Sequence, residues 1–441
     1  MPRPLPRTFR VKSFGCQMNV YDGERMGELL TAEGMTPAAE GEQAELTVLN
    51  TCHIRDKATE KVYSDIGRLA KEGRRSGVRP MIAVAGCVAQ AEGAEVAARS
   101  KDVDVVVGPQ AYHHLPALLA KAAKGEAALD TSLPALAKFG RLPPRGLSRR
   151  TSAFLTVQEG CDKFCTYCVV PYTRGSEVSR SWSAVLDEAR ALLDAGAIEI
   201  TLLGQNVNAW VGTDEAGRAQ GLDGLIRALD RMGVRRIRYT TSHPNDMTAA
   251  LIAAHGEVPG LMPYLHLPVQ SGCDRVLKAM NRSHTAASYL RVLDRVRAAR
   301  PDIALSGDFI VGFPGETEAE FGDTLTLVRE VGYAAAYSFK YSARPGTPAA
   351  VLPGAVPDEV MDERLQGLQA ALAESATAFN AGCVGRRCEV LLDRPGRREG
   401  QRIGKTPWLQ SVHLQTDAPL GSLVEVELVS AGPNSLGGVA V

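Results

Sequence analysis

Residues Gly160 to Glu177 read GCDKFCTYCVVPYTRGSE. This stretch places Cys161, Cys165 and Cys168 at the spacing C-x3-C-x2-C, so that a short loop can turn three thiols toward one centre. Thiolates are the ligands that iron–sulfur clusters take in proteins. Three thiolates on a four-iron cluster leave one iron without a protein ligand, and an open coordination position is typical of a reactive metal site. The stretch therefore predicts a catalytic iron–sulfur site.

A zinc loop, or a set of ordinary buried cysteines, is the alternative interpretation of this spacing. Zinc normally takes a fourth Cys or His close by, and the nearest histidine downstream is His243. The iron–sulfur interpretation is favoured for this reason.

The preceding segment, residues 8 to 125, alternates short apolar runs with helical patterns. Strands that alternate with helices indicate a parallel sheet, here a small doubly wound one. We expect strands at Phe9–Phe14, Glu45–Leu49, Met81–Ala85 and Val103–Val107, and helices near Glu24–Ala32, Lys57–Glu72 and Gln90–Ala98.

Three more cysteines follow the first three of these strands. Cys16 stands in SFGCQMN, Cys52 in LNTC and Cys87 in VAGC, each just after a small or turn-forming residue. Loops that follow the strands of an open parallel sheet share one edge, where such folds bind ligands. A buried core thiol is the alternative for any one of them. Three cysteines in equivalent positions favour a second site with three thiolates.

Residues 126 to 150 lose the periodicity and contain Pro143, Pro144 and Gly146. A Pro/Gly-rich basic segment between two patterned regions indicates a linker. Its charges either face solvent or attract phosphate groups. The basic residues are Lys138, Arg141, Arg145, Arg149 and Arg150.

The middle segment, residues 151 to 376, repeats the strand–helix alternation six times. Six units are too few for a closed eight-unit barrel, so we expect a partial barrel with the first cysteine loop after its first strand. Polar and Gly-rich loops at the same mouth favour a substrate and cofactor site. Strands are expected at Phe154–Val157, Ile198–Leu203, Arg236–Tyr239, Tyr264–Leu267, Ile303–Ile310 and Ala335–Tyr341, helices at Ser183–Leu193 and Thr317–Val331, and site loops at Leu203–Asn208, Ser242–Asp246, Leu267–Gly272, Gly307–Thr317 and Tyr341–Thr347.

The last segment, residues 380 to 441, has short strand-like runs and turns, typical of a small antiparallel barrel. We expect strands at Arg387–Leu392, Ser411–Gln415 and Ser422–Val429. A local basic excess, with Trp408 near for stacking, favours nucleic-acid binding; a solvated basic face is the alternative. The candidate RNA-binding residues are Arg386, Arg387, Arg397, Arg398, Arg402 and Lys405.

Composition limits the classes further. At 441 residues the chain suggests several domains, and 50 basic residues balance 50 acidic ones, so that no whole-molecule field favours a nucleic-acid partner. Nine cysteines behind an N-terminus without a signal peptide indicate a reducing cytosol, and hence a cytoplasmic protein. No apolar run reaches the roughly 18 residues of a membrane span.

These motifs resemble, over nearly the whole chain, those of the radical S-adenosylmethionine methylthiotransferases. The chain departs from the family pattern at Cys273, where relatives carry Ser in QSGS; we leave Cys273, Cys383 and Cys388 out of the ligand set. The matching stretches are SFGCQMN at Ser13–Asn19, NTC at Asn50–Cys52, GC at Gly86–Cys87, EGCDKFCTYCVVPYTRGSEVSR at Glu159–Arg180, LGQNVNAW at Leu203–Trp210, HLPVQSG at His266–Gly272 and YSARPGTPAA at Tyr341–Ala350.

The resemblance implies an α/β multidomain fold with a flavodoxin-like methylthiotransferase domain, a partial (β/α)6 radical SAM barrel and a small C-terminal TRAM barrel. It also implies two 4Fe-4S clusters. The auxiliary cluster would be held by Cys16, Cys52 and Cys87, and the radical SAM cluster by Cys161, Cys165 and Cys168.

The implied activity is methylthiolation of C2 of N6-dimethylallyladenosine, next to the anticodon of tRNA. S-Adenosylmethionine would supply both a 5′-deoxyadenosyl radical and the methyl group, because an aromatic C–H bond is beyond side-chain acid–base chemistry. The implied partners are the tRNA anticodon loop, a reductase or flavodoxin-type electron donor and iron–sulfur cluster assembly proteins.

Two rival functions remain at this point. A sister methylthiotransferase would act on an aspartate of a ribosomal protein or on threonylcarbamoyladenosine of tRNA; QMN after Cys16, together with GQNVNAW, favours the dimethylallyladenosine branch. An RNA-binding protein with structural metal sites would not cleave S-adenosylmethionine at all.

Overall fold

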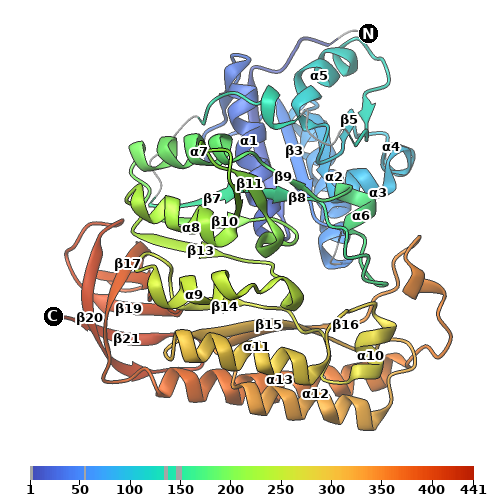
Figure 1. Ribbon diagram of the computed structural model, residues 1–441. Coiled ribbons are helices and arrows are strands. Elements are labelled where there is room, and N and C mark those ends of the chain that lie inside the picture. The colour runs from blue at the N-terminus through green and yellow to red at the C-terminus, as the bar shows by residue number, and fades with distance from the viewer. Residues whose placement is uncertain (1–2, 54–55, 134–137, 146–150) are drawn as a thin grey trace. The chain divides into compact units, whose positions relative to one another are not determined.

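The computed structural model describes residues 3–53, 56–133, 138–145 and 151–441 (Figure 1). The chain divides into two compact units, which are described one at a time below. The first unit comprises Met1–Gly146, Gln158–Asp162 and Val169–Val178, and the second comprises Leu147–Val157, Lys163–Cys168 and Ser179–Val441.

The first unit is built on a six-stranded sheet of order β2-β1-β3-β4-β5-β6. All its pairings are parallel, and the order β2-β1-β3-β4-β5 is that of flavodoxin-like folds. The predicted sheet is confirmed. Its strands are β1 (Thr8–Phe14), β2 (Thr36–Pro37), β3 (Leu46–Thr51), β4 (Met81–Gly86), β5 (Val105–Val107) and β6 (Leu129–Asp130).

Helices cover both faces of this sheet because its buried strands present apolar side chains alternately to each side. Leu46 and Val48 pack in one core with α1 and α5, whereas Leu49 and Val84 pack in a second core with α2 and α4. The expected helix at Gln90–Ala98 is two short helices, since Gly93 interrupts it with a φ of +51°. The helical segments are α1 (Gln17–Ala32), α2 (Asp56–Ser76), α3 (Cys87–Glu92), α4 (Ala94–Arg99), η1 (Tyr112–His114), α5 (Leu115–Ala123) and η2 (Phe139–Arg141).

Two basic residues of the segment 126–150 correct the expectation of exposed charges. Lys138 is buried, and only 5 % of the Arg145 side chain is exposed, with Glu24 and Glu28 at 3.4 and 3.5 Å. Arg141 is exposed and lies 3.1 Å from a ring nitrogen of His114. Arg149 and Arg150 lie outside the described residues.

The second unit contains the six predicted parallel strands, in two sheets of order β13-β10-β7 and β14-β15-β16. A parallel bridge between Ile237 and Leu261 lies between the two sheets, and one apolar core of this partial barrel includes residues from Ala153 to Leu372. The partial barrel is confirmed. Its strands are β7 (Ser152–Thr156), β10 (Glu199–Leu203), β13 (Arg236–Tyr239), β14 (Tyr264–His266), β15 (Ala304–Val311) and β16 (Ala335–Lys340).

Several helices of this unit begin at Ser or Thr residues whose side chains cap them. Thr317 caps α12: its hydroxyl accepts from the backbone N of Glu320, whose carboxylate accepts from the backbone N of Thr317 at 2.8 Å. Gly332 ends the same helix in the left-handed conformation. The helices are α7 (Trp182–Asp194), α8 (Leu222–Arg231), α9 (Ala249–Glu257), α10 (Asp274–Ala279), α11 (Ala286–Ala299), α12 (Glu318–Val331) and α13 (Asp358–Ala381).

Short elements connect these parts of the fold. They are β8 (Gln158–Glu159), α6 (Val170–Arg174), β9 (Val178–Ser179), η3 (Val207–Ala209), β11 (Val211–Thr213), β12 (Ala219–Gly221), η4 (Pro244–Asp246) and η5 (Pro348–Val351). Helix α13 runs through the predicted boundary at residues 376–380, and the middle and last segments belong to one compact unit.

The last segment forms a closed barrel of order β17-β18-β19-β21-β20, which confirms the predicted fold. One pairing, β19 with β21, is parallel, and the other four are antiparallel. Strands β18 and β21 were not predicted. The strands are β17 (Arg387–Pro395), β18 (Gln401–Lys405), β19 (Ser411–Gln415), β20 (Leu423–Ala431) and β21 (Leu436–Ala440).

This barrel packs against the amino-terminal ends of the partial-barrel strands. Its core includes Ala304, the first residue of β15, and Ala334, just before β16. Arg238 of β13 donates to the carbonyl oxygens of Thr406 and Pro407 at 3.0 and 2.8 Å. The carboxyl ends of the strands, where barrel chemistry occurs, face away from this contact. Among the described residues, no helix combines the length and the apolarity that crossing a bilayer requires.

Candidate functional site

The first candidate site lies at the carboxyl edge of the N-terminal sheet. Phe14 of β1 pairs with Thr51 of β3, and Thr51 pairs with Gly86 of β4, so three neighbouring strands end in register. Cys52 and Cys87 are the next residues after β3 and β4, and Cys16 follows β1 by two positions. The structure thus brings these three predicted ligands to one edge of the sheet.

Close packing of the loops holds these cysteines near one another. Gly15 has a φ of +107°, and a Cβ there would lie 2.2 Å from the Cβ of Cys52 and 3.4 Å from its Sγ. Gly86 has a φ of +86°, and its Cβ would lie 2.4 Å from Oδ1 of Asn50. Only glycine fits where the backbone approaches so closely with a positive φ. The small residues before Cys16 and Cys87 are therefore required by the site.

A hydrogen-bond chain links these loops further. The thiol of Cys16 donates to Oδ1 of Asn19 at 3.0 Å, and Nδ2 of Asn19 donates to Oδ1 of Asn50 at 3.2 Å. Asn50 in turn donates to the backbone oxygen of Asn19 at 2.6 Å. Both asparagines are fully buried, so these bonds satisfy amides that have no access to water.

The local environment favours thiolate at one of the three positions. A hydrogen bond from Cys52 lowers the pKa of Cys16 to about 6, against the effect of burial, and the charge of Arg174 acts in the same direction. Burial raises the pKa of the Cys87 thiol, and Arg174 opposes that rise by its charge and by a hydrogen bond. Metal ligands must be deprotonated, so a nearby cation helps this edge to bind metal.

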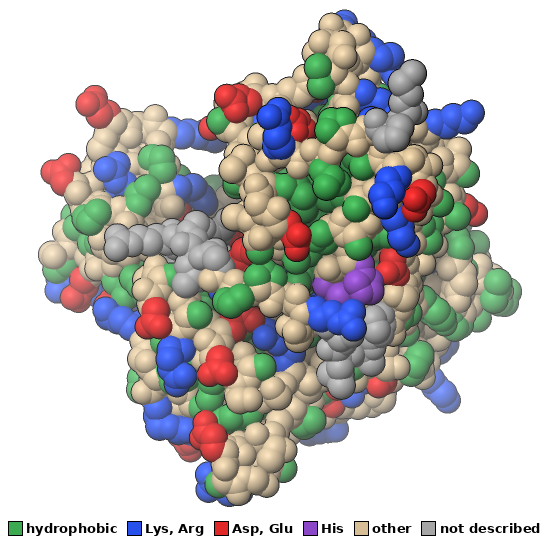
Figure 2. Space-filling model, turned by 90° about the horizontal axis from the view of Figure 1, so that it is seen from above, with side chains coloured by type: hydrophobic (Ala, Val, Ile, Leu, Met, Phe, Trp, Pro, Cys, Tyr) green, Lys and Arg blue, Asp and Glu red, His purple; other side chains and the backbone are tan. Residues whose placement is uncertain are grey.

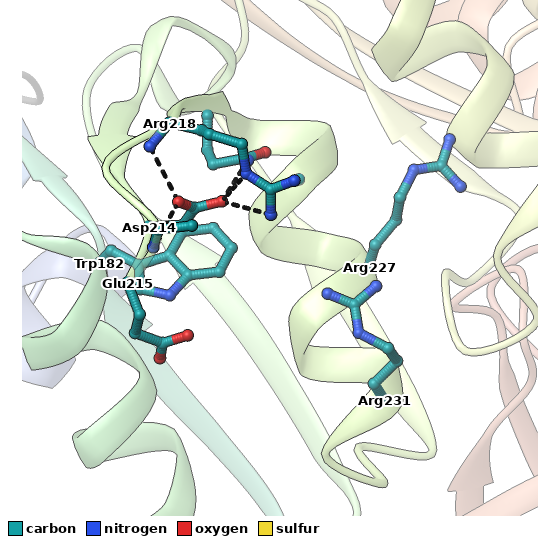
Figure 3. A pocket seen from close by; sticks show the side chains of 9 residues that line it. Trp182, Asp214, Glu215, Arg218, Arg227 and Arg231 are labelled. Atoms are coloured by element: carbon teal, nitrogen blue, oxygen red, sulfur yellow. Dashed lines mark hydrogen bonds and ion pairs between the residues drawn. The ribbon is translucent and has the colours of Figure 1, made fainter.

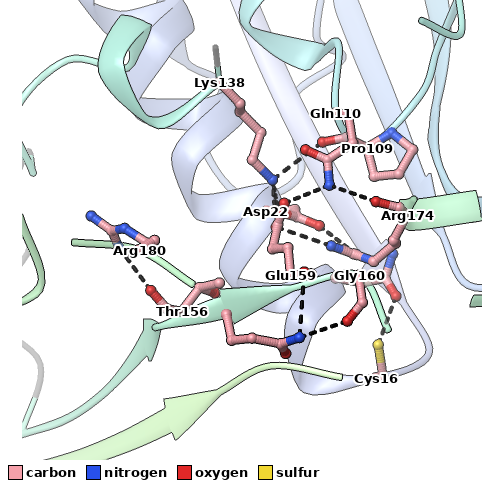
Figure 4. Close-up of polar contacts among 12 residues, drawn as sticks. Cys16, Asp22, Pro109, Gln110, Lys138, Thr156, Glu159, Gly160, Arg174 and Arg180 are labelled. Carbon is pink, nitrogen blue, oxygen red and sulfur yellow. Dashed lines mark hydrogen bonds and ion pairs between the residues drawn. The ribbon is translucent and has the colours of Figure 1, made fainter. Parts of the chain in front are cut away.

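Four buried charges lie close together near Cys16: Asp22, Lys138, Glu159 and Arg174, called here the buried ion cluster (Figure 4). Arg174 contacts Asp22 at 2.7 Å and Glu159 at 3.2 Å. Lys138 donates to Glu159 and lies 3.7 Å from Asp22. Gln110 donates to Glu159 at 2.6 Å and to the backbone oxygen of Arg174 at 3.1 Å. Two acids and two cations thus compensate one another without water.

Reasoning from the sequence missed the buried ion cluster. Glu159 and Arg174 do stand within the stretch that carries the cysteine loop, two residues before Cys161 and six after Cys168. Their place beside the loop was a signal that they serve it. Lys138 gave no such signal, because it stands in a segment whose composition is typical of solvated loops.

The second candidate site is the loop from Cys161 to Cys168. The division between the compact units falls after Asp162, so Cys161 belongs to the first unit and Cys165 and Cys168 to the second. In the first unit the backbone N of Cys161 donates to Gly175 O at 3.2 Å. In the second, the backbone N of Cys168 donates to Cys165 O at 2.9 Å, which forms a tight turn between these two cysteines.

A buried arginine faces this loop within the second unit. Nη1 of Arg282 donates to Sγ of Cys165 at 3.6 Å, and Nη2 donates to Pro268 O at 2.6 Å. Burial opposes the charge of Arg282, but Tyr167 and Cys165 raise its pKa above the usual value. Arg282 is therefore a fixed cation beside the cysteine loop.

Loops at the carboxyl ends of the partial-barrel strands contact the cysteine loop. Lys163 lies 2.7 Å from Oδ2 of Asp246, and Asn206 donates to the same oxygen at 2.8 Å. These contacts join the cysteine loop to the loops after β10 and β13. The predicted stretches 203–208, 242–246, 267–272 and 341–347 follow β10, β13, β14 and β16, whereas the first five residues of 307–317 belong to β15 itself.

Phe164, within this loop, has the left-handed φ of +49° that side chains rarely adopt, and it is 55 % exposed. Asn281, itself at a φ of +56°, donates to Phe164 O at 2.9 Å and to Lys163 O at 3.3 Å. Such strain persists only where neighbouring contacts enforce it. The loop therefore has a fixed conformation at this exposed residue.

His243 lies at the same end of the partial barrel, and its imidazole is uncharged at neutral pH. Burial, together with the charges of Arg282 and His284, lowers its pKa to about 2. Its Nδ1 accepts from the backbone N of Asn245 at 3.3 Å, and its own backbone N donates to Oδ1 of Asn208 at 2.9 Å. These bonds fix two loops at the ends of β10 and β13.

The cysteines left out of the ligand set are packed thiols. Cys273 stands just before α10 and packs in a small apolar cluster with Phe313 and Met280, and burial raises its pKa. Cys383 is in the core of the C-terminal barrel, and burial raises the pKa of Cys388 to about 11. None of these three has the environment of a reactive thiolate.

The predicted RNA-binding residues do not form one solvent-facing set. Arg397 and Arg398 are exposed between β17 and β18, whereas Arg387 pairs with Glu427 at 3.1 Å. Lys405 donates to Ser411 at 2.8 Å, and burial lowers its pKa. Arg402 is half-buried, and Arg386 lies over the ring of Trp408, 5.5 Å from its centroid.

Trp408 corrects the expectation of an exposed stacking residue. It is 6 % exposed in the core of the C-terminal barrel, and its Nε1 donates to Oδ2 of Asp302 at 3.3 Å. The indole therefore stabilises the contact between the C-terminal barrel and the partial barrel.

A pocket of about 430 Å³ lies between the β11–β12 hairpin, α7 and α8 (Figure 3). Arg218 pairs with Asp214 at 2.9 Å, and Arg227 pairs with Glu257 at 2.7 Å. Hydrogen bonds from Arg218 lower the pKa of Asp214 to about 2. The guanidinium groups of Arg218 and Arg227 are thus already neutralised. On the face that Figure 2 shows, basic and acidic side chains are likewise interspersed.

The donor set at the sheet edge suits a cluster better than a single ion. Among the described side chains, no three His, Cys, Asp or Glu residues close around a point that a single ion could occupy. A four-iron cluster is larger than one ion and takes each thiolate on a different iron, so its ligands need not meet that geometry. Three thiols at one sheet edge, with a buried cation beside them, fit such a cluster.

Comparisons with known proteins agree with this organisation. The model of a family described as "Uncharacterized protein family UPF0004" matches residues 8–108, and that of the radical SAM superfamily matches residues 155–328. The chain is 68% identical over 438 residues to the tRNA-2-methylthio-N(6)-dimethylallyladenosine synthase of Erythrobacter litoralis, covering 99% of this chain and 98% of that protein. It is 64% identical over 439 residues to the synthase of the same name from Zymomonas mobilis, covering 99% and 98%.

Solved structures share the fold at low identity. The radical S-adenosylmethionine methyltransferase TsrM from Kitasatospora setae is 14% identical, with a TM-score of 0.57 over 78% of this chain and 75% of that one. The cobalamin-dependent S-adenosylmethionine radical enzyme OxsB is 14% identical, with a TM-score of 0.54 over 83% and 56%.

Proposed function

Because this chain belongs to the tRNA-2-methylthio-N(6)-dimethylallyladenosine synthases, a family of radical S-adenosylmethionine methylthiotransferases, we propose how its residues divide that reaction between two sites. The reaction is the methylthiolation of C2 of N6-dimethylallyladenosine next to the anticodon of tRNA. The observation that carries it is full-length identity of 68% to proteins that bear this name. The enzyme uses S-adenosylmethionine and two 4Fe-4S clusters.

The auxiliary cluster is assigned to Cys16, Cys52 and Cys87. Its support is the register of β1, β3 and β4, which ends three strands together just before the three cysteines. Burial keeps water away from this edge, since Cys52 is 2 % and Cys87 is 6 % exposed. A buried thiolate site protects sulfur chemistry from hydrolysis.

The radical SAM cluster is assigned to Cys161, Cys165 and Cys168. A cluster held by these three cysteines would supply one-electron chemistry to bound S-adenosylmethionine, because side-chain acid–base groups cannot activate an aromatic C–H bond. The chain's own work here is positioning. The tight turn between Cys165 and Cys168, and the ion pair of Lys163 with Asp246, fix the loop before any substrate arrives.

The C-terminal barrel is assigned to tRNA binding. The target base must leave the anticodon-loop stack, which costs less in a single strand than in a duplex. Arg397 and Arg398 are the exposed candidates for phosphate contacts on this barrel. Their place in the turn between β17 and β18 leaves both guanidinium groups in reach of a nucleic-acid backbone.

The finer partners follow from the chemistry of the two clusters. Each turnover needs an electron, which we assign to a reductase or a flavodoxin-type donor. Four-iron clusters need dedicated assembly proteins, and cysteine-held clusters persist in a reducing compartment, so we assign the enzyme to the cytoplasm.

The test is anaerobic reconstitution of the full chain, followed by counts of iron and sulfide and assays of 5′-deoxyadenosine and tRNA nucleosides. We expect about eight irons per chain. About four irons would contradict the assignment of two clusters, and absence of the methylthio nucleoside would contradict the substrate.

Variants of the two cysteine sets separate their roles. Cys161→Ala, Cys165→Ala or Cys168→Ala is expected to abolish 5′-deoxyadenosine formation. Cys16→Ala, Cys52→Ala or Cys87→Ala is expected to leave part of that formation and to abolish the methylthio product. Equal loss of 5′-deoxyadenosine in both sets would contradict the division.

A further inference from the structure

Arg174 occupies a special position relative to the first cysteine site. It is the last residue of α6, which packs against α3, the helix that begins at Cys87. Only 2 % of its side chain is exposed. A buried arginine is rare unless its charge has a partner, and Arg174 has partners on two sides.

The partners on one side are the acids of the buried ion cluster. Nη2 of Arg174 contacts Oδ2 of Asp22 at 2.7 Å, and Nη1 contacts Oε1 of Glu159 at 3.2 Å. Gln110 holds the backbone of Arg174 through a bond of 3.1 Å to its carbonyl oxygen. The guanidinium is therefore fixed in orientation by its hydrogen bonds (Figure 4).

The cysteines lie on the other side. Asp22 stands on α1, which begins directly after Cys16, so the contact of Arg174 with Asp22 also ties it to the loop of Cys16. Within the cluster, Lys138 already donates to Glu159 and to Pro109 O at 3.3 Å. Arg174 is thus a cation close enough to act on both cysteines: its charge lowers the pKa of Cys16 and opposes the rise in the pKa of Cys87.

We propose that Arg174 is a positioning residue that supplies a fixed positive charge to the auxiliary iron–sulfur site, with Asp22 and Glu159 holding its guanidinium against Cys16 and Cys87. The proposal rests on the assignment of the auxiliary cluster to those cysteines and to Cys52. It goes beyond that assignment, because it names the residue that sets the electrostatics of the site.

The physical consequence is a shift in reduction potential. Reduction adds negative charge to a cluster, and a nearby cation stabilises the reduced form, so that it raises the potential. The effect is large where water is excluded, because charges interact more strongly at low dielectric. Asp22 acts in the opposite direction, since its carboxylate partly neutralises Arg174.

The experiment isolates the auxiliary cluster in the full-length chain by replacing Cys161, Cys165 and Cys168 with Ala. Iron is counted after reconstitution, and the potential is measured by a redox titration monitored by electron paramagnetic resonance. In this background Arg174→Gln should lower the potential, with at least a tenfold fall in the ratio of reduced to oxidised cluster at fixed potential, which is about 59 mV for one electron. Arg174→Lys should recover part of the shift.

The matched control is Arg180→Gln. Arg180 is also a buried arginine of the same motif, and it pairs with Glu188 at 2.7 Å. Arg180→Gln should lower the free energy of unfolding but leave the reduction potential of the auxiliary cluster unchanged. An equal shift in Arg180→Gln and Arg174→Gln would overturn the proposal.

Asp22→Asn gives a result of opposite sign and does not depend on the folding of Arg174→Gln. Asn keeps an oxygen that can accept from Arg174, so the substitution removes the negative charge while the guanidinium stays held, and it should raise the potential. If Arg174 and Asp22 only stabilised the fold, the two substitutions would not shift the reduction potential in opposite directions. An unchanged potential in Asp22→Asn, with about four irons bound, overturns the proposal. Absence of iron in the parent background would instead overturn the cluster assignment on which it rests.

Discussion

Nη1 of Arg282 lies 3.6 Å from Sγ of Cys165, so the cysteine loop and the turn after α10 meet through a cation and a thiol. Arg282→Gln removes this charge from beside the cysteine loop. We expect roughly a tenfold slower formation of 5′-deoxyadenosine, equivalent to about 1.4 kcal/mol, with unchanged affinity for tRNA. Arg300→Gln, which removes an ion pair with Asp302 at 2.7 Å, is the control. Equal rates in the two variants would contradict this role of Arg282.

Gly86 and Gly93 flank the short helix α3 and offer a matched pair. Both have positive φ, but a Cβ at Gly86 would lie 2.4 Å from Asn50, whereas a Cβ at Gly93 meets nothing within 4 Å. Gly93→Ala should cost only the backbone strain, about 1–3 kcal/mol of unfolding free energy. Gly86→Ala should cost several kcal/mol and also reduce the iron bound at the first site. Thermal unfolding and iron counts measure both effects. Equal effects of the two substitutions would show that the close approach of Gly86 to Asn50 does not matter for the site.

His255 predicts a dependence of stability on pH. Burial lowers its pKa to about 4 in the folded chain, from about 6.5 when unfolded, and its Nε2 lies 2.6 Å from the hydroxyl of Tyr239. Between these pH values the unfolded chain binds a proton that the folded chain does not. Stability should therefore fall as pH decreases from about 6.5 to about 4, by up to roughly 3 kcal/mol.

His255→Gln keeps a polar partner for Tyr239 but does not titrate. Unfolding in denaturant should show a smaller fall in stability over this pH range than in the parent protein. Other buried histidines remain in both proteins, so the difference between the two profiles is the quantity to compare. Parallel profiles would show that His255 is not the source.

Arg397 and Arg398 test the tRNA role of the C-terminal barrel. Replacing both with Gln should weaken tRNA binding and reduce the slope of log K against log salt by about 0.7 for each lost phosphate contact. Arg387→Gln should have less effect, because Arg387 already pairs with Glu427. Filter binding at several salt concentrations measures both, and an unchanged slope in the double variant would remove these residues from the interface.

Much of the fold could be predicted from local patterns. The strand Ser411–Gln415 has the predicted bounds because its apolar residues alternate cleanly. Strands β18 and β21 contain Gly404, Gly437 and Gly438, which hide the alternation. A Cβ at Gly404 would lie 2.5 Å from Leu391 O. Neighbouring strands, not local propensity, make these segments extended.

The two candidate sites were predictable to different depths. One set of cysteines has a close, regular spacing, and the other set stands at equivalent places after three strands. Both sets of candidate ligands could therefore be predicted from the amino-acid sequence alone. The buried ion cluster combines residues from positions 22, 138, 159 and 174, and only the folded chain brings them together. Opposite charges far apart in sequence carry no local signal of pairing.

The common end point of β1, β3 and β4 limits how this protein can change its length. An insertion of one residue in any of these strands would move its cysteine by about 3.3 Å and turn the following side chains to the opposite face. Insertions and deletions in the strands that end at Phe14, Thr51 and Gly86 should therefore prevent cluster assembly. Length variation should instead collect in connections on the far edge of the sheet, such as the residues between α1 and β3.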